Sequence, residues 1–265
     1  MHGTGETSPF AIVDGHLGPS CTVGPFALIS RGARVGAACV VHSHALVGAD
    51  ARIGDRCIVH PHAVVGPGVV LGEGVELLHS AVVGREPRSA GATARDPSFA
   101  HRLYVGDGCA IGSHATIYYD VEIGDHTLVG DAASIREGAR IGSRCIVSRC
   151  VTLNYDVTIG NDVKVMDATH LTGGTQIGDG AFISILVATT NDNQPRQPLG
   201  HDRRLEGPRI ESGATVGAGA ILLPGVVVGA NATVAAGAVV TRDVPSGATA
   251  MGMPARARRD QSADP

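Results

Sequence analysis

Aliphatic residues recur at every sixth position over most of the 265-residue chain. Helices place apolar residues three and four positions apart and simple strands two apart, so a strict step of six fits neither pattern. The step instead predicts a triangular prism, in which each six-residue unit is a short strand plus a corner and three units complete one turn. Such turns stack in parallel at about 4.8 Å. The aliphatic positions form three blocks: Leu17, Val23, Ile29, Val35, Val41, Val47, Ile53, Val59, Val65, Leu71, Leu77 and Val83; then Val105, Ile111, Ile117, Ile123, Val129, Ile135, Ile141, Val147, Leu153, Ile159, Val165, Leu171, Ile177 and Ile183; then Ile210, Val216, Leu222, Val228, Val234 and Val240.

This pattern predicts an all-β protein, a left-handed parallel β-helix of hexapeptide repeats with 18-residue triangular turns. We expect a polar N-terminus over residues 1–10, a single β-helix domain over 11–245 and a C-terminal tail over 246–265. The six-step is lost at 85–104 and 188–208, which predicts two protruding loops. A solenoid confines its chemistry to what protrudes from it, so these loops are candidates for function.

Glycine follows many of the aliphatic residues, as in Val35-Gly36, Ile53-Gly54 and Ile141-Gly142. We expect the backbone at these corners to adopt a conformation that a Cβ would penalise.

Composition fits a solenoid. The chain has 37 glycines, no tryptophan and only four phenylalanines and four tyrosines, so its core must consist of medium-sized aliphatic residues. The net charge is −4 and basic residues form no long run, which argues against nucleic acid or an anionic membrane as a partner. The first residues lack a signal-peptide pattern and no apolar run is long enough to span a membrane, so a cytoplasmic protein is expected.

Five of the six cysteines share one slot of the repeat. Each lies two residues before an aliphatic position, where small inward-facing residues fit, and this predicts reduced core residues rather than disulfides or metal ligands. Cys150 sits elsewhere in its hexad and stays open. The five are Cys21, Cys39, Cys57, Cys109 and Cys145.

Histidines also follow the repeat. His42 and His60 are one turn apart, as are His44 and His62, and this spacing predicts surface ladders rather than a site. The histidine spacing of γ-carbonic-anhydrase zinc sites is not present, so no metal is expected.

The stretch IESGATVGAGAILLPGVVVGANATVAAGAVVTRDVPSGATAMGMPARA resembles the C-terminal half of coenzyme-A-dependent hexapeptide acyltransferases, in which LPGV, GAGAVVT(K/R)DVP and G-(N/M)-PA(K/R) occur together. The resemblance implies acetyl-CoA as cosubstrate and a homotrimer with sites between neighbouring prisms. It implies that pantetheine amides meet the backbone around Ala218 and Ala236. It also implies that Arg242 and Arg256 lie near the coenzyme's phosphates, unless they are plain surface charges.

The segment Thr190-Asn191-Asp192-Asn193-Gln194-Pro195-Arg196 resembles the T-N-D-x-x-P-R element of acetyltransferases that act on dTDP-linked 3-amino sugars and their UDP-sugar relatives. This implies acceptor binding by Asn191, Asp192 and Arg196. The first block with its Arg85 loop is loosely similar to UDP-N-acetylglucosamine O-acyltransferases, which use acyl carrier protein, and that similarity favours a hydroxyl acceptor.

Polar and aromatic residues coincide at one corner of the second block. A solvated corner would explain any one of them, but their coincidence on consecutive turns is typical of a small-molecule site. Just before this corner, on the outward face, lie Ser134, Thr152 and His170. The corner itself reads Tyr118-Tyr119-Asp120, Arg136-Glu137-Gly138, Asn154-Tyr155-Asp156 and Thr172-Gly173-Gly174, of which Asn154, Tyr155 and Asp156 are candidate substrate ligands.

Acyl transfer requires two reactants to be positioned, a proton removed and an oxyanion stabilised. Glu137 occupies the register position at which the O-acyltransferase relatives carry their catalytic histidine. His170 is our first choice for the general base, with Glu137 orienting it or substituting for it. A purely structural His170 is the competing interpretation. His201 in the second loop is a rival, because galactoside and xenobiotic acetyltransferases carry their catalytic histidine in the corresponding loop.

The leading hypothesis is N-acyl transfer, with acetyl as the expected group, from coenzyme A to the amino group of a nucleotide-linked amino sugar or similar small amine. O-acylation of a sugar hydroxyl or another small alcohol is the alternative. A non-catalytic β-helix scaffold is the third hypothesis.

Overall fold

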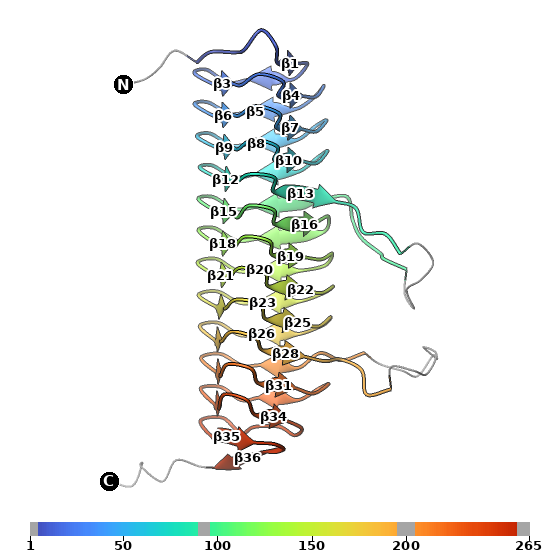
Figure 1. The fold of residues 1–265 in the computed structure, drawn as a ribbon, viewed down its shortest axis with the longest axis vertical. Helices are drawn as coiled ribbons and strands as arrows, with labels where there is room; N and C mark the ends of the chain where they lie inside the picture. The colour runs from blue at the N-terminus through green and yellow to red at the C-terminus, as the bar shows by residue number, and fades with distance from the viewer. Residues whose placement is uncertain (1–4, 90–95, 195–204, 259–265) are drawn as a thin grey trace, which may run out of the picture. The chain divides into compact units, whose positions relative to one another are not determined.

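The structure is a computed structural model that describes residues 5–89, 96–194 and 205–258. It contains two compact units: Met1–Pro87 with Ser98–Gly138 (unit 1), and Arg88–Pro97 with Ala139–Pro265 (unit 2). In each unit short strands form three sheets, and consecutive strands of the chain enter successive sheets. In Figure 1, strands whose labels differ by three, such as β4, β7 and β10, therefore lie one above another. The predicted left-handed parallel β-helix is confirmed.

Unit 1 shows how the repeat makes the fold. Leu28 and Ile29 pair with Leu46 and Val47, exactly one 18-residue turn later, so equivalent residues of successive turns form parallel ladders. The strands are β1 (Ile12–Val13), β2 (His16–Leu17), β3 (Thr22–Val23), β4 (Leu28–Ile29), β5 (Arg34–Val35), β6 (Val40–Val41), β7 (Leu46–Val47), β8 (Arg52–Ile53), β9 (Ile58–Val59), β10 (Val64–Val65), β11 (Val70–Leu71), β12 (Glu76–Leu77), β13 (Val82–Arg85), β14 (Leu103–Val105), β15 (Ala110–Ile111), β16 (Thr116–Tyr118), β17 (Val121–Ile123), β18 (Leu128–Val129) and β19 (Ser134–Ile135).

Unit 2 continues the same pattern, with one change at its end. The last two strands form an antiparallel hairpin in which Met251 lies opposite Arg256, within the segment that the sequence assigned to a tail. The strands are β20 (Arg140–Ile141), β21 (Ile146–Val147), β22 (Thr152–Leu153), β23 (Thr158–Ile159), β24 (Lys164–Val165), β25 (His170–Leu171), β26 (Gln176–Ile177), β27 (Phe182–Ile183), β28 (Ala188–Thr189), β29 (Arg209–Ile210), β30 (Thr215–Val216), β31 (Ile221–Leu222), β32 (Val227–Val228), β33 (Thr233–Val234), β34 (Val239–Val240), β35 (Thr249–Gly252) and β36 (Ala255–Arg258). No helix among the described residues is long and apolar enough to cross a membrane.

The second residue of most strands points inward and is buried, as the six-step predicts. The five cysteines of the shared slot are also buried, which confirms that part of the prediction, whereas Cys150 is exposed. Their thiols contact the next turn: Cys39 Sγ lies 3.1 Å from the Gly54 carbonyl oxygen. These cysteines are therefore core residues that also join successive turns.

The predicted histidine ladders are present in unit 1. The rings of His42 and His60 stack at 5.1 Å, and those of His44 and His62 at 4.9 Å. Phe26 extends the second ladder, stacking on His44 at 5.1 Å. Side chains in equivalent positions thus stack along the solenoid, and no convergence on a metal is needed to explain their spacing.

The expected reason for the glycines after aliphatic positions is wrong. Gly54 does not have a positive φ; instead, a Cβ there would lie 2.5 Å from the carbonyl oxygen of Gly72 on the next turn. Left-handed backbone occurs two residues further on, and non-glycine residues such as Asp50 (φ 57°) and Arg56 (φ 59°) adopt it. Close approach of successive turns, rather than backbone conformation, selects these glycines.

Polar side chains at the same corner hydrogen-bond to the turn before, and this ladder was not predicted from the sequence. Asp55 Oδ1 accepts a hydrogen bond from the Ala37 amide at 2.7 Å, one turn earlier. Asp125 does the same for Asp107 at 2.9 Å, and Asp179 for Asn161 at 2.7 Å. Each side chain satisfies a corner amide that has no strand partner. The recurrence of Asp and Asn two residues after the aliphatic position was the signal.

Both predicted loops occur where the six-step breaks. The first follows β13 and returns at β14, so that Val70 pairs with Tyr104 rather than with the residue 18 positions on. The second follows β28 and returns at β29. In Figure 1 the first loop leaves its turns at β13, and the second leaves its own at β28.

Candidate active site

The candidate site residues fall in both units, with Glu137 in unit 1 and Thr152, Tyr155 and His170 in unit 2.

In unit 1, the guanidinium groups of two arginines lie over the ring of Tyr118. The guanidinium carbon of Arg85 is 5.3 Å from the ring centroid and that of Arg136 is 5.9 Å away. Arg136 also forks the carboxylate of Glu137, with Nε at 3.1 Å from Oε2 and Nη2 at 2.9 Å from Oε1. Glu137 is only 1% exposed, so this bidentate pair compensates a buried charge.

The neighbouring residues of this corner hold the first loop. Asp120 accepts hydrogen bonds from the Ala100 amide at 3.3 Å and from Arg102 Nε at 3.4 Å. The Tyr119 hydroxyl donates to the Pro67 carbonyl at 2.8 Å, and burial raises the pKa of this phenol. Tyr119 and Asp120 therefore serve to fix the loop and the corner.

In unit 2, His170 points outward from β25 and pairs with Thr152 on β22. The Thr152 hydroxyl and His170 Nδ1 are 2.7 Å apart. Partial burial lowers the pKa of His170, which favours the neutral imidazole. If Nδ1 carries the proton and donates to Thr152, Nε2 is left as a proton acceptor.

Asn191 connects the second loop to the corner beyond His170. Its Nδ2 donates to the Tyr155 hydroxyl at 3.3 Å and to the Gly173 carbonyl at 3.2 Å. The Tyr155 ring packs on Gly173 so closely that a Cβ there would lie 2.4 Å from the ring. The structure thus brings together Tyr155 and Asn191, two residues that the sequence identified as candidate substrate ligands.

Thr189 links the same segments and was missed at the level of sequence. It occupies the inward position that an aliphatic residue would take six residues after Ile183, and it is buried. Its hydroxyl accepts from the Thr172 amide at 2.7 Å and lies 3.3 Å from the His170 carbonyl, to which it donates. A polar residue at an inward position was the available signal.

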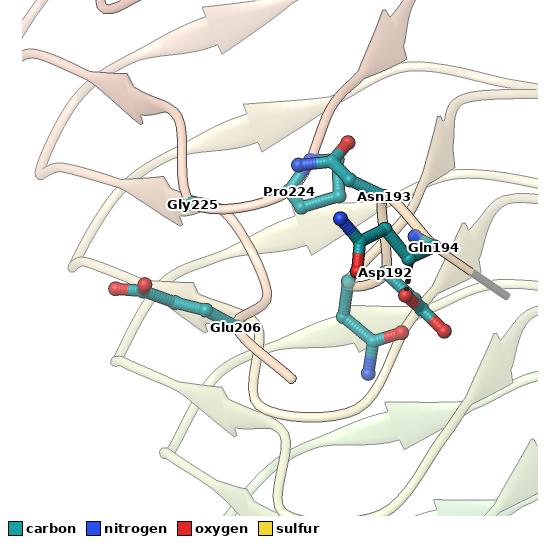
Figure 2. A pocket seen from close by; sticks show the side chains of 7 residues that line it. Asp192, Asn193, Gln194, Glu206, Pro224 and Gly225 are labelled. Carbon is teal, nitrogen blue, oxygen red and sulfur yellow. Dashed lines mark hydrogen bonds between the residues drawn. The ribbon is translucent and has the colours of Figure 1, made fainter. Parts of the chain in front are cut away.

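Asp192 lines a hollow of about 190 Å³ together with Asn193, Pro224 and Glu206. In Figure 2, Asn193 and Pro224 lie close to one another, and the Glu206 carboxylate points away from the Asp192 side chain. The Glu206 amide donates to the Asn191 carbonyl at 3.1 Å, which joins the described arms of the second loop. Pro224 belongs to the LPGV motif, but the sequence assigned it no role in the site, and Glu206 lies outside every motif named from the sequence.

The other predicted ligands lie as follows. Asn154 Oδ1 accepts from the Tyr155 amide at 3.0 Å, so its amide group caps the corner locally. Asp156 is exposed, with a φ of 56°, at the same corner. Arg196 and His201 lie outside the described residues.

The predicted coenzyme residues occupy the last turns of unit 2. Ala218 and Ala236 lie at equivalent corners, since the amide of Gly237 donates to the Ala218 carbonyl at 2.8 Å. Arg242 is exposed at the corner after β34. Arg256 is exposed on β36, with Nη1 at 3.2 Å from the Ala255 carbonyl.

Two family descriptions match the chain. The bacterial transferase hexapeptide (six repeats) matches residues 50–85 and 207–242, and the hexapeptide repeat of succinyl-transferase matches residues 120–155. These matches cover separate stretches of hexapeptide repeat and agree with the repeat fold. No curated protein matches it in sequence.

Several solved structures resemble the chain. A single-site mutant of AntD, an N-acyltransferase from Bacillus cereus in complex with dTDP-4-amino-4,6-dideoxyglucose and coenzyme A, is 19% identical over 52% of this chain and 81% of its own, with a TM-score of 0.44. The UDP-N-acetylglucosamine acyltransferase of Arabidopsis is 19% identical over 98% of this chain and 73% of its own, with a TM-score of 0.39. The serine acetyltransferase of Neisseria gonorrhoeae is 27% identical over 40% of this chain and 39% of its own, with a TM-score of 0.29.

Proposed function

We propose that this protein transfers an acyl group, acetyl in the first instance, from a coenzyme A thioester to the amino group of a nucleotide-linked amino sugar. The observation that carries the proposal is the attachment of Asn191 to the corner beyond His170, through Tyr155 and the Gly173 carbonyl. These two hydrogen bonds attach the segment that resembles the amino-sugar element to the corner after His170. The imidazole of His170 can accept a proton.

The reaction asks little of the protein beyond positioning. The amine nitrogen attacks the thioester carbonyl carbon, the carbon–sulfur bond breaks, and the coenzyme leaves as a thiolate. In our proposal Nε2 of His170 takes the proton that the attacking nitrogen loses and returns it to the departing sulfur. Thr152 holds the ring in the tautomer that this role needs.

Glu137 is better suited to positioning than to proton transfer. Both of its oxygens accept hydrogen bonds from Arg136, so a proton on the carboxylate would have to displace a guanidinium. We assign it the role of fixing Arg136 against Tyr118, which leaves His170 as the proposed base.

O-acylation is the second candidate, and one observation favours it. A hydroxyl needs a base more urgently than an amine does, and the lowered pKa of His170 favours the unprotonated imidazole that such a base requires. A hydroxyl acceptor would use the same residues.

Release of coenzyme A thiol tests both candidates. The full chain is incubated with acetyl-CoA and with matched pairs of dTDP- and UDP-sugars that carry an amine or a hydroxyl at the same carbon. Thiol release with the amino sugars only supports the N-acyl proposal, and release with the hydroxyl sugars only supports O-acylation. No thiol above background, together with no thermal stabilisation by coenzyme A, would favour the scaffold hypothesis; a binder at 100 times its dissociation constant gains about 2.7 kcal/mol.

The coenzyme site makes its own prediction. Arg242→Ala should raise the KM for acetyl-CoA about tenfold with little change in kcat, because a lost phosphate contact weakens ground-state and transition-state binding equally. Arg144→Ala is the control, since Arg144 pairs with Asp162 at 2.7 Å on an exposed corner of the same unit. An unchanged KM in the Arg242 variant would show that this arginine does not bind the coenzyme.

The assembly and location follow the family resemblance. We propose a homotrimer in the cytoplasm, with no nucleic acid, membrane or metal as partner. A mass from light scattering that equals one or two chains would contradict the trimer.

A further inference from the structure

A groove in unit 1 is lined by none of the residues of the proposed active site. It encloses about 470 Å³ and opens over β2, β5 and β8. Its polar lining residues are Asp14, His16, Arg34, Asp50 and Arg52.

Three of these side chains form one ladder. His16 pairs with Arg34, and Arg34 pairs with Arg52, at the outward position of neighbouring parallel strands. Equivalent positions on neighbouring strands are about 4.8 Å apart. Like charges that face each other across strands are destabilising, so two arginines at neighbouring positions of one ladder raise the question of what neutralises them.

The protein itself does not neutralise them through close ion pairs. Within the described residues, neither Arg34 nor Arg52 has an ion pair shorter than 4.0 Å, although Asp14 and Asp50 line the same groove. By contrast Arg56, three residues after β8 ends, pairs with Glu73 at 2.6 Å. Both groove arginines are exposed and keep their hydrogen-bond donors available to a ligand.

Small residues also line the groove, together with the aspartates and the arginines. Gly15, Gly32 and Ala33 lie here, and a Cβ at Gly32 (φ +79°) would lie 2.2 Å from Asp50 Oδ1. The absence of larger side chains leaves room for a ligand beside the arginines.

We propose that this groove binds a small phosphorylated polyol, such as a sugar phosphate. A phosphate monoester carries close to two negative charges and three terminal oxygens, so one group can accept hydrogen bonds from both guanidinium forks. A carboxylate ligand has one charge and two oxygens, so it offers fewer acceptors to the two guanidinium groups than a phosphate does. The Asp14 and Asp50 carboxylates only accept hydrogen bonds, and they suit the hydroxyl groups of such a ligand.

Calorimetric titration of the full chain tests the proposal with two probes, inorganic phosphate and glucose 1-phosphate. We expect glucose 1-phosphate to bind more tightly than phosphate. The double variant Arg34→Gln/Arg52→Gln should weaken both by at least tenfold. Arg56→Gln, which removes a nearby paired arginine, should bind both as the wild type does.

A variant of the two aspartates distinguishes a phosphorylated polyol from a simple phosphate as the ligand. Asp14→Asn/Asp50→Asn should lower the affinity for glucose 1-phosphate and leave that for inorganic phosphate unchanged or higher; asparagine tolerates the left-handed backbone of residue 50. If this variant binds both probes as the wild type does, the ligand is a simple phosphate and the polyol part of the proposal is wrong.

Two results would overturn the phosphate site itself. One is no heat of binding for either probe with the wild type at 10 mM phosphate, roughly the weak end of small-ligand affinities. The other is equal loss of binding in the Arg34/Arg52 and Arg56 variants. Neither result bears on thiol release, so this site and the proposed acyl transfer can fail independently.

Discussion

Replacing His170 by alanine should lower kcat for acyl transfer about 100-fold or more, because positioned general bases contribute roughly 10²–10⁴-fold. KM for acetyl-CoA should stay nearly constant, since the imidazole is proposed to act on the acceptor. His114→Ala is a matched control, because His114 is another exposed histidine of the repeat and lies in unit 1. Turnover that survives in His170→Ala would leave the histidine with a structural role and direct attention to His201.

The pH dependence gives a second readout of the same role. A base must be unprotonated to act, so kcat/KM should rise with pH through the pKa of His170, which lies below 6.5. This rising limb should disappear in His170→Ala, while any limb due to the acceptor amine stays at its own higher pH.

Thr152→Val should reduce kcat about fivefold to tenfold, as expected for the loss of one orienting hydrogen bond.

The fold could be predicted because one constraint repeats. Every turn must bury an aliphatic residue at the same position, so the step of six is visible without any other knowledge. The cysteines followed from the same register, since Cys39 and Cys57 occupy equivalent small inward positions. The reason for the glycines could not be obtained in this way, because the contact between Gly54 and Gly72 joins successive turns and has no local signature.

The site was predicted less completely than the fold. Asn191 and Tyr155 were chosen separately, one from a motif and one from its register, and their contact depends on how the second loop returns to the corner. Thr189 and Glu206 were not predicted, because neither residue belongs to a motif that resembles a known family. A buried threonine where the repeat demands an aliphatic residue is a local rule broken near a functional candidate, which is where such breaks are expected.

Gly142→Ala should destabilise the protein by about 3 kcal/mol, because overpacking against fixed atoms costs about 1–3 kcal/mol and backbone cannot move aside as a side chain can. The new Cβ would lie 2.5 Å from the carbonyl oxygen of Gly160 on the next turn. Chemical denaturation followed by circular dichroism measures the change.

Gly180→Ala distinguishes the two explanations for corner glycines. Gly180 has a φ of +67°, yet a Cβ there would meet nothing within 4 Å, and non-glycine residues such as Asp162 adopt this backbone at equivalent corners. Its replacement should cost only about 1–2 kcal/mol, the penalty of a left-handed residue. If close approach between turns governs the repeat, Gly142→Ala is the more damaging of the two. The reverse order would mean that backbone conformation, as the sequence first indicated, is the dominant constraint on glycine in this solenoid.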